Sequence, residues 1–390
     1  MTAPLIYLVA GEPSGDLLGA RLMAGLRALD PELTFAGVGG EAMREEGLAN
    51  LFPQADLAVM GLAEVLPRIP RIARRLRETV ADIVARRPAA IVTIDSWGFN
   101  RRLIDRLMRA GVTAPRVHCV APMVWAWKAK RVHELAGRVD LLLCLLPNEP
   151  PLFEAAGVRA IHIGHPVLES GADKGDGAAF RARHGIPPET IIVSVLPGSR
   201  RSEIARLLPP FGETLGRLAQ THLGLRAVVP TVETVASAVA EGVRDWPIPV
   251  TLVRGSRERY DAFAASRAAL AASGTVTLEL AMSGVPMVVG YRMNPVTVFF
   301  AKRLIKIPFA SMPNILAGRE VVPELLQENC RPDLLAPALT RLLDDEAARA
   351  AQKSGLDEAL VKLGRGAEAP SRRAARAIIE MVRIPSLRGA

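Results

Sequence analysis

The chain has 390 residues, of which 49% are hydrophobic and 23% charged. This composition is typical of a globular protein and excludes a disordered or fibrous chain. At about 150 residues per domain, the length predicts two domains with a sizeable core. The 49 lysines and arginines exceed the 40 aspartates and glutamates by nine. This positive charge favours an anionic partner: phosphate groups, nucleic acid or an acidic membrane surface.

The cysteines and the N-terminus indicate where the protein works. Cys119, Cys144 and Cys330 form no C-x-x-C pair, which argues against a disulfide framework or a zinc site and fits a reducing cytosol. The first residues lead straight into a strand-like stretch without an export signal. The most apolar stretch, 285–300, contains Arg292 and Pro295, so no segment reaches the ~20 apolar residues of a membrane-spanning helix. We therefore expect any membrane contact to be peripheral.

Short apolar runs alternate with amphipathic stretches, which predicts an α/β protein with βαβα order and mostly parallel sheets. The runs are 5–10, 90–94, 117–120, 141–145, 161–163, 191–196, 227–229, 250–253, 268–271 and 286–290. Small and charged residues at 171–180 predict a linker. We expect two doubly wound, Rossmann-like domains, 1–170 and 171–345, that face a cleft. A helical, basic tail, 346–390, would then follow and could pack back on the first domain.

The first motif, Gly-Glu-Pro-Ser-Gly-Asp at 11–16, follows the first strand and opens a helix. Its glycines let the backbone approach a ligand, and a helix N-terminus favours anions. The motif is neither a P-loop nor G-x-G-x-x-G. Glu12, Ser14 and Gly15 are therefore candidate loop or substrate contacts. The alternative is a tight turn in which Asp16 caps the helix.

Two further segments of the first domain could carry chemistry. Asp95 ends the strand 90–94, where ligands of α/β sheets bind, and its carboxylate could remove a proton from an attacking hydroxyl. The alternative is a helix N-cap. Trp125 and Trp127 precede three cations and suit stacking on bases or a wall for an apolar phosphorylated substrate. Core packing is the alternative for one of the two rings.

The loop at 196–203 is a candidate phosphate-binding loop of the second domain. Gly198 and Ser199 free backbone amides there, and Arg200 supplies a charge that suits a phosphate. The alternative for this loop is an N-capped surface turn with solvated arginines.

A second candidate loop, Ser273-Gly274-Thr275, opens another helix, in which Glu279 could reach a ribose. The alternative for Glu279 is a first-turn acid that stabilises the helix. Together the two loops predict a nucleotide. The chain has no H-E-x-x-H, C-x-x-C, Asp-x-Asp or Walker A motif, so we expect no metal and no cofactor, and Arg200 and helix ends would carry the phosphate charge.

These motifs resemble those of the lipid-A-disaccharide synthases, and the resemblance covers nearly the whole chain. The matching strings are AGEPSGD at 10–16, GVGG at 37–40, VMGL at 59–62, VWAW at 124–127, IGHP at 163–166, LPGSR at 196–200, SGT at 273–275, VVGYRM at 288–293 and MPNILAGRE at 312–320.

The resemblance implies a GT-B glycosyltransferase that joins UDP-2,3-diacylglucosamine to 2,3-diacylglucosamine 1-phosphate and releases UDP. It implies that Asp95 is the base and that Asn314 contacts the nucleotide. The family's second carboxylate is Gly98 in this chain, which puts a mechanism with two carboxylates in doubt.

Because both substrates carry acyl chains, we expect a protein of the cytoplasm that binds peripherally to the anionic inner face of the inner membrane. Five arginines and four apolar residues at 66–77 suit that surface, and a solvated basic helix is the alternative. The oligomeric state stays open, with a homo-oligomer among the options.

Other functions remain as alternatives at this point. A UDP-N-acetylglucosamine 2-epimerase or the peptidoglycan N-acetylglucosaminyltransferase would share the architecture, but these families lack the strings at 124–127 and 312–320. A nucleic-acid-binding protein would explain the charge. The chain has no RRM, KH or helix-turn-helix signature, so we expect no nucleic acid.

Overall fold

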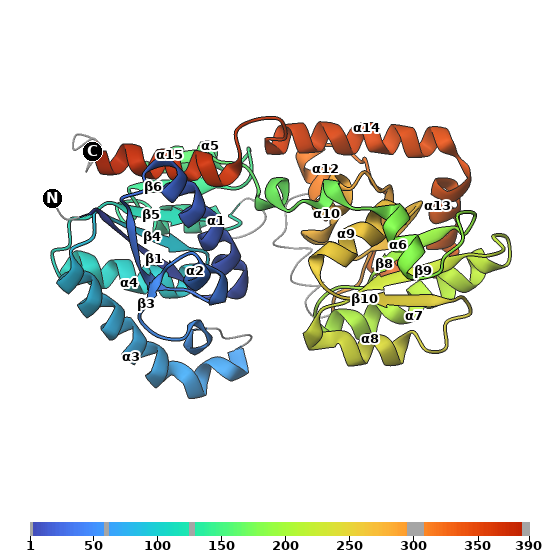
Figure 1. The fold of residues 1–390 in the computed structure, drawn as a ribbon, viewed down its shortest axis with the longest axis horizontal. Coiled ribbons are helices and arrows are strands. Elements are labelled where there is room, and N and C mark those ends of the chain that lie inside the picture. Colours follow the sequence, from blue (N-terminus) through green and yellow to red (C-terminus); the bar gives the residue numbers. More distant parts are fainter. Residues whose placement is uncertain (1–2, 58–61, 125–128, 295–307, 384–390) are drawn as a thin grey trace. The chain divides into compact units, whose positions relative to one another are not determined.

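The computed structural model describes residues 3–57, 62–124, 129–294 and 308–383 (Figure 1). The chain forms two compact units. The first comprises Met1–Pro166 together with Gly366–Ala390, and the second comprises Val167–Arg365. The change of unit after Pro166 lies near the linker expected at 171–180. The expected tail is divided, because its first helix belongs to the second unit and its last helix to the first.

The first unit contains a parallel sheet in the order β3-β2-β1-β4-β5-β6-β7. Its strands are β1 (Leu5–Ala10), β2 (Thr34–Val38), β3 (Ala49–Asn50), β4 (Ala90–Ile94), β5 (Arg116–Cys119), β6 (Leu141–Cys144) and β7 (Ala160–His162). Its helices are α1 (Pro13–Leu29), α2 (Glu41–Glu45), α3 (Leu62–Arg86), α4 (Trp97–Arg109), α5 (Pro150–Glu154) and α15 (Pro370–Arg383). The central strands are buried on both faces, as their continuous apolar runs predict.

The last helix of the chain, α15, completes the core of the first unit. It packs on α1 (Figure 1), where a β-carbon at Gly25 would lie 2.8 Å from the Ser371 carbonyl oxygen. Ala374, Ala375 and Ile378 of α15 are buried in the same cluster as β1 and β4. Glycine at position 25 therefore permits the close approach of the two helices.

The second unit contains a parallel sheet in the order β10-β9-β8-β11-β12-β13. Its strands are β8 (Ile192–Leu196), β9 (Arg226–Pro230), β10 (Val250–Val253), β11 (Ala268–Ala271), β12 (Met287–Tyr291) and β13 (Glu324–Leu326). Its helices are α6 (Gly177–Arg183), α7 (Arg201–Ala219), α8 (Ala236–Gly242), α9 (Ser256–Ala265), α10 (Val276–Met282), α12 (Met312–Ala317), α13 (Pro332–Asp344) and α14 (Glu346–Leu363). In the described part of the chain, none of the helices has both the length and the apolar character that a bilayer crossing requires.

Candidate functional site

Asp95 lies at the carboxyl edge of the first sheet, directly after β4, in an unusual turn. Asp95 and Ser96 both have left-handed backbones, with φ of +51° and +43°. Such residues cost conformational energy and concentrate at functional sites. The Ser96 amide donates to Asp95 Oδ1 over 2.8 Å, and Asn100 Nδ2 donates to the Asp95 carbonyl oxygen over 2.7 Å. The turn is therefore held from both sides, and the half-buried carboxylate is fixed at the sheet edge.

The loop after β1 meets this turn, so two of the predicted segments come together. The Ser96 hydroxyl donates to Glu12 Oε1 over 3.1 Å. Gly15 is buried where α1 crosses the sheet, and a β-carbon there would lie 3.5 Å from Ile94 Cγ2. Ser14 is exposed in the first turn of α1. Glu12 therefore lies beside the turn that holds Asp95.

The last residue of the first motif has a structural contact that the sequence did not indicate. The Asp16 carboxylate is buried and accepts hydrogen bonds from the amides of Gly40, Ala42 and Met43 at 2.7–3.1 Å. It thus caps α2 and not the helix in which it lies, and it joins the loop 39–43 to α1.

His118, in β5 beside this site, is neutral at physiological pH. Burial lowers its pKa to about 3. The Thr93 hydroxyl donates to the Val117 carbonyl oxygen and therefore accepts from His118 Nδ1, 2.8 Å away. This network assigns the tautomer and leaves Nε2 an acceptor without a partner among the described residues. The His118 ring packs against the Trp97 ring at a centroid distance of 4.8 Å and an interplanar angle of 56°.

The structure describes the position of the missing second carboxylate, Gly98, but not the two tryptophans, Trp125 and Trp127. Gly98, which stands where the family has a second carboxylate, is exposed, and a β-carbon there would meet only Arg102, at 3.9 Å. Apart from its two chain neighbours, no other described side chain lies within 4 Å of the place where a β-carbon at Gly98 would be. Trp125 and Trp127 lie outside the described residues.

The predicted phosphate loop follows β8. Gly198 has a φ of +104°, and a β-carbon there would overlap the Glu203 carboxylate. Glu203 accepts from the amides of Ser199 and Arg200 and from the Arg200 guanidinium, at 3.0–3.2 Å. The Arg200 side chain is 73% exposed. The sequence did not indicate this role of Glu203, although its spacing three residues after Arg200 is that of a capping box.

The second predicted loop, after β11, carries Ser273, Gly274 and Thr275 at the start of α10. The Ser273 hydroxyl donates to the Ala310 carbonyl oxygen over 2.8 Å. Glu279, one turn into the helix, accepts from Arg259 at 3.0 Å. Burial raises the pKa of the Glu279 carboxyl, and Arg259 opposes this shift. The Glu279 carboxylate is thus already paired, although 17% of the side chain is exposed.

Asn314 is fully buried, and both its side-chain nitrogen and its side-chain oxygen form hydrogen bonds to other groups of the protein. Nδ2 donates to the Val322 carbonyl oxygen and to Glu324 Oε1, while Oδ1 accepts from the amides of Val321 and Val322, all at 2.7–2.9 Å. Glu324 also accepts from the Ala310 amide at 2.8 Å. Through Ala310, the segment that Asn314 holds is connected to Ser273.

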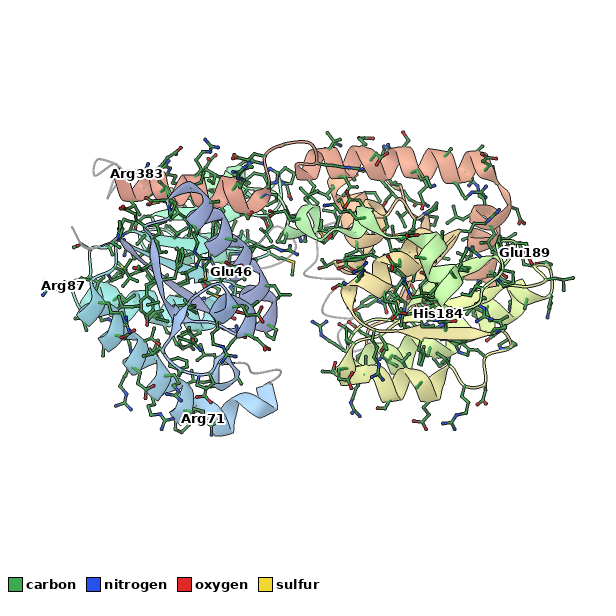
Figure 2. The ribbon with its side chains drawn as sticks, in the orientation of Figure 1. Glu46, Arg71, Arg87, His184, Glu189 and Arg383 are labelled. Carbon is green, nitrogen blue, oxygen red and sulfur yellow. The ribbon has the colours of Figure 1, made fainter. Side chains whose placement is uncertain are left out.

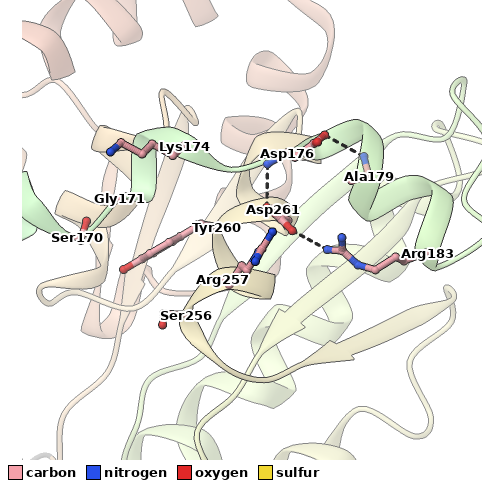
Figure 3. Close-up of a pocket in the computed structure, with 10 residues that line it drawn as sticks. All are labelled: Ser170, Gly171, Lys174, Asp176, Ala179, Arg183, Ser256, Arg257, Tyr260 and Asp261. Carbon is pink, nitrogen blue, oxygen red and sulfur yellow. Dashed lines mark hydrogen bonds and ion pairs between the residues drawn. The ribbon is translucent and has the colours of Figure 1, made fainter. Parts of the chain in front are cut away.

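A polar hollow of about 400 Å³ lies in the second unit between α9 and the segment 170–183 (Figure 3). Lys174, Arg183 and Arg257 line it, and Asp261 accepts there from Arg183 at 2.6 Å. None of the residues predicted from the sequence lines the hollow. Tyr260, which does, lies 3.4 Å from Glu279 Oε1, so the hollow adjoins the predicted ribose-binding carboxylate. Within the described ranges, no three His, Cys, Asp or Glu side chains gather in a way that suits a metal ion.

Two solved structures illustrate the proteins that share this architecture. The UDP-N-acetylglucosamine 2-epimerase of Neisseria meningitidis, bound to UDP-GlcNAc, superposes with a TM-score of 0.60 at 12% identity, covering 96% of this chain and 98% of that one. MurG of Acinetobacter baumannii gives a TM-score of 0.58 at 13% identity, covering 97% and 99%. At these identities the likeness shows the fold alone. The class is that of the GT-B fold, with two Rossmann-like parallel-sheet units and a helical C-terminal segment.

Sequence comparison identifies the family within this class. A family model described as "Lipid-A-disaccharide synthetase" matches residues 6–379. The lipid-A-disaccharide synthase of Paramagnetospirillum magneticum is 57% identical over 382 residues, which cover 97% of this chain and 98% of that protein. That of Rhodospirillum centenum is 52% identical over 379 residues, which cover 97% and 94%. The chain belongs to the lipid-A-disaccharide synthase family of glycosyltransferases, as its motifs predicted.

Proposed function

We propose that the protein transfers 2,3-diacylglucosamine from UDP-2,3-diacylglucosamine to 2,3-diacylglucosamine 1-phosphate and releases UDP. The observation that carries this proposal is the family match, which spans residues 6–379 and includes relatives of 57% and 52% identity. The arrangement of each unit supports it, because carboxylates gather at the edge of one sheet and candidate phosphate-binding loops at the edge of the other.

Asp95 is the proposed general base. The acceptor hydroxyl attacks the anomeric carbon, its proton moves to the Asp95 carboxylate, and the bond from the anomeric carbon to UDP breaks with its electron pair on the phosphate oxygen. Glu12 lies beside Asp95 through Ser96, so it is proposed, with Ser14 and Gly15, to border the acceptor. Trp125 and Trp127 are proposed as walls for the lipid substrates.

The second unit is proposed to hold the donor. Arg200, whose guanidinium is largely exposed, would stabilise the negative charge that develops on the leaving diphosphate. Gly198 and Ser199 shape its loop. Ser273, Gly274 and Thr275 would approach the phosphates, and Glu279 would exchange part of its contact with Arg259 for a ribose hydroxyl. Asn314 would act through the segment 310–324 that it holds.

The protein is further proposed to bind the anionic inner face of the inner membrane through α3. Arg71 projects from this helix (Figure 2) and is 56% exposed, Arg74 is equally exposed, and Ile69 is 49% exposed. Cations beside an exposed apolar side chain suit an acidic lipid surface. Leu76, counted with this surface in the sequence, is buried in the core of the first unit, so the proposed contact is narrower.

Acceptor-dependent release of UDP tests the proposal. The protein is incubated with UDP-2,3-diacylglucosamine, with and without the 1-phosphate acceptor, and UDP is measured. We expect UDP only when both substrates are present. Conversion of the UDP-linked sugar into its epimer in the absence of acceptor would indicate an epimerase. UDP release at the same rate with and without acceptor would indicate a hydrolase. Either result would overturn the proposed transfer.

A further inference from the structure

A carboxylate of the protein occupies the turn that the sequence assigns to phosphate. The consecutive amides of Ser199 and Arg200 both point at Glu203 Oε2, at 3.0 and 3.2 Å. Consecutive backbone amides of this kind form an anion-binding site. In this chain the anion is Glu203, which is only 8% exposed. Gly198 is required beside it, since any β-carbon would overlap the carboxylate.

The same carboxylate is held from a second strand and a side chain. Its other oxygen, Oε1, accepts from the Tyr291 hydroxyl at 3.1 Å and from Arg200 Nη1 at 3.2 Å. Tyr291 is the last residue of β12, so its hydroxyl links the end of that strand to the loop after β8. Burial and the neighbouring Glu203 raise the pKa of Tyr291, which keeps the phenol protonated as the donor.

These contacts change how the loop can meet a diphosphate. The two amides are already paired, and a second anion could use them only by displacing Glu203. The Arg200 guanidinium donates to Glu203 through one nitrogen, and 73% of the side chain is exposed to solvent. Within the described ranges its remaining N–H groups have no other partner, and the bond to the carboxylate orients them.

We infer that Glu203 and Tyr291 are positioning residues of the donor site, which hold the loop 198–200 and orient Arg200 for the diphosphate of the donor. On this inference the Arg200 side chain, and not the amides of Ser199 and Arg200, binds the phosphate oxygens. The inference rests on the proposed function, because it takes UDP as the ligand of this loop.

Calorimetry with UDP tests the inference on the full-length protein. Glu203→Gln removes the charge that orients Arg200, and we expect UDP affinity to fall about tenfold, as for the loss of one hydrogen bond to a charged group. Tyr291→Phe keeps the ring and removes one bond to the carboxylate, so a smaller fall is expected. Arg200→Ala should weaken UDP at least as much as Glu203→Gln. The matched control is Glu213→Gln on the same helix, where Glu213 is 61% exposed and pairs with Arg217.

Whether UDP affinity falls or rises in the variants shows whether Glu203 positions Arg200 or blocks the amides. Tighter UDP binding by Glu203→Gln would mean that the carboxylate blocks the amides, and it would overturn the inference. Unchanged affinity in Glu203→Gln and Tyr291→Phe, with only a lower melting temperature, would reduce both residues to structural support. If Glu203→Gln does not fold, Tyr291→Phe decides alone. The donor KM should rise in these variants while the acceptor KM stays constant. Wild-type protein that binds no UDP would instead contradict the proposed function.

Discussion

At the scale of single residues, Asp95 is the position on which the chemistry depends. Asp95→Asn should lower turnover roughly 10²- to 10⁴-fold, because asparagine cannot accept the proton of the acceptor hydroxyl. The fold should survive. Asparagine tolerates the left-handed backbone of this position, and its side-chain oxygen can still accept from the Ser96 amide.

Turnover and the melting temperature of this one variant distinguish a base from a structural cap. UDP affinity should stay close to that of the wild type, since the proposed nucleotide contacts lie in the second unit. Activity near the wild-type level in a normally folded variant would remove Asp95 from the mechanism.

Two histidines of the first unit, His118 and His165, predict how its stability depends on pH. Burial lowers the pKa of His118 to about 3, and that of His165 to about 4. Both folded values lie below the unfolded value of about 6.5. The stability that depends on the neutral rings is therefore fully present above pH 6.5 and is lost as the pH falls, because only the unfolded chain takes up the protons.

His118→Asn isolates this contribution. The variant keeps a group near Nδ1 for Thr93 but does not titrate. Between about pH 6.5 and 3, the free energy of unfolding should fall less steeply than in the wild type, by up to about 1.4 kcal/mol per pH unit. Denaturant unfolding at several pH values measures the slopes. Parallel curves for the two proteins would show that His118 binds its proton equally in both states.

At the scale of elements, the charge of α3 is partly neutralised within the protein. Arg75 pairs with Asp56 at 2.6 Å, pairs with Glu78 and stacks over the Phe52 ring at 4.6 Å. Arg74 reaches Glu78 at 3.5 Å, and Arg71 reaches Asp56 at the same distance. The proposed membrane contact therefore depends on the more exposed arginines of this helix.

Binding to anionic vesicles should accordingly weaken with salt, because such attraction is screened beyond about 8 Å at physiological ionic strength. Arg77→Glu on the exposed face of α3 should weaken it further, whereas Arg217→Glu on α7 of the second unit should not. Vesicle flotation at rising salt measures both effects. If neither rising salt nor Arg77→Glu weakens binding to the vesicles, apolar residues elsewhere insert into the membrane.

The helix α15 belongs energetically to the first unit, although it lies at the other end of the chain. Ile378 is fully buried in the core cluster that contains β1 and β4. Ile378→Ala should lower the free energy of unfolding by about 2–5 kcal/mol, as expected for a large side chain lost from a packed core. The control is Val361→Ala in α14, where the side chain is 63% exposed. This substitution should change the free energy of unfolding little. Equal, small effects in denaturant unfolding would show that α15 does not stabilise the unit.

At the scale of the whole molecule, the sequence predicted most of the fold. Both parallel sheets are confirmed, and the runs 5–10, 90–94, 250–253 and 268–271 are strands with those bounds. Three strands were not among the runs: β2, whose sequence Thr-Phe-Ala-Gly-Val contains a glycine, and the edge strands β3 and β13, of two and three residues. Pairing with a neighbour defines the two edge strands, and their local pattern is too short to reveal it.

The candidate site was predictable in its segments but not in its contacts. Spacing placed Asp95 and Arg200 at strand ends, where the parallel sheets hold them. The partners of Asp16, Glu203 and Asn314 were not predictable, because each carboxylate or amide bonds to backbone groups whose position only the tertiary structure determines. Polar residues that resemble ligand contacts in a sequence motif can thus instead form hydrogen bonds that hold the neighbouring loop in place.

The product formed from an isotope-labelled donor tests the central claim most directly. The protein is given UDP-2,3-diacylglucosamine labelled in its glucosamine, together with unlabelled 2,3-diacylglucosamine 1-phosphate, and the lipids are analysed by mass spectrometry. The account predicts a disaccharide monophosphate that carries the label in one of its two sugars, with one UDP released per molecule. Folded protein that consumes the donor without forming this disaccharide would contradict it.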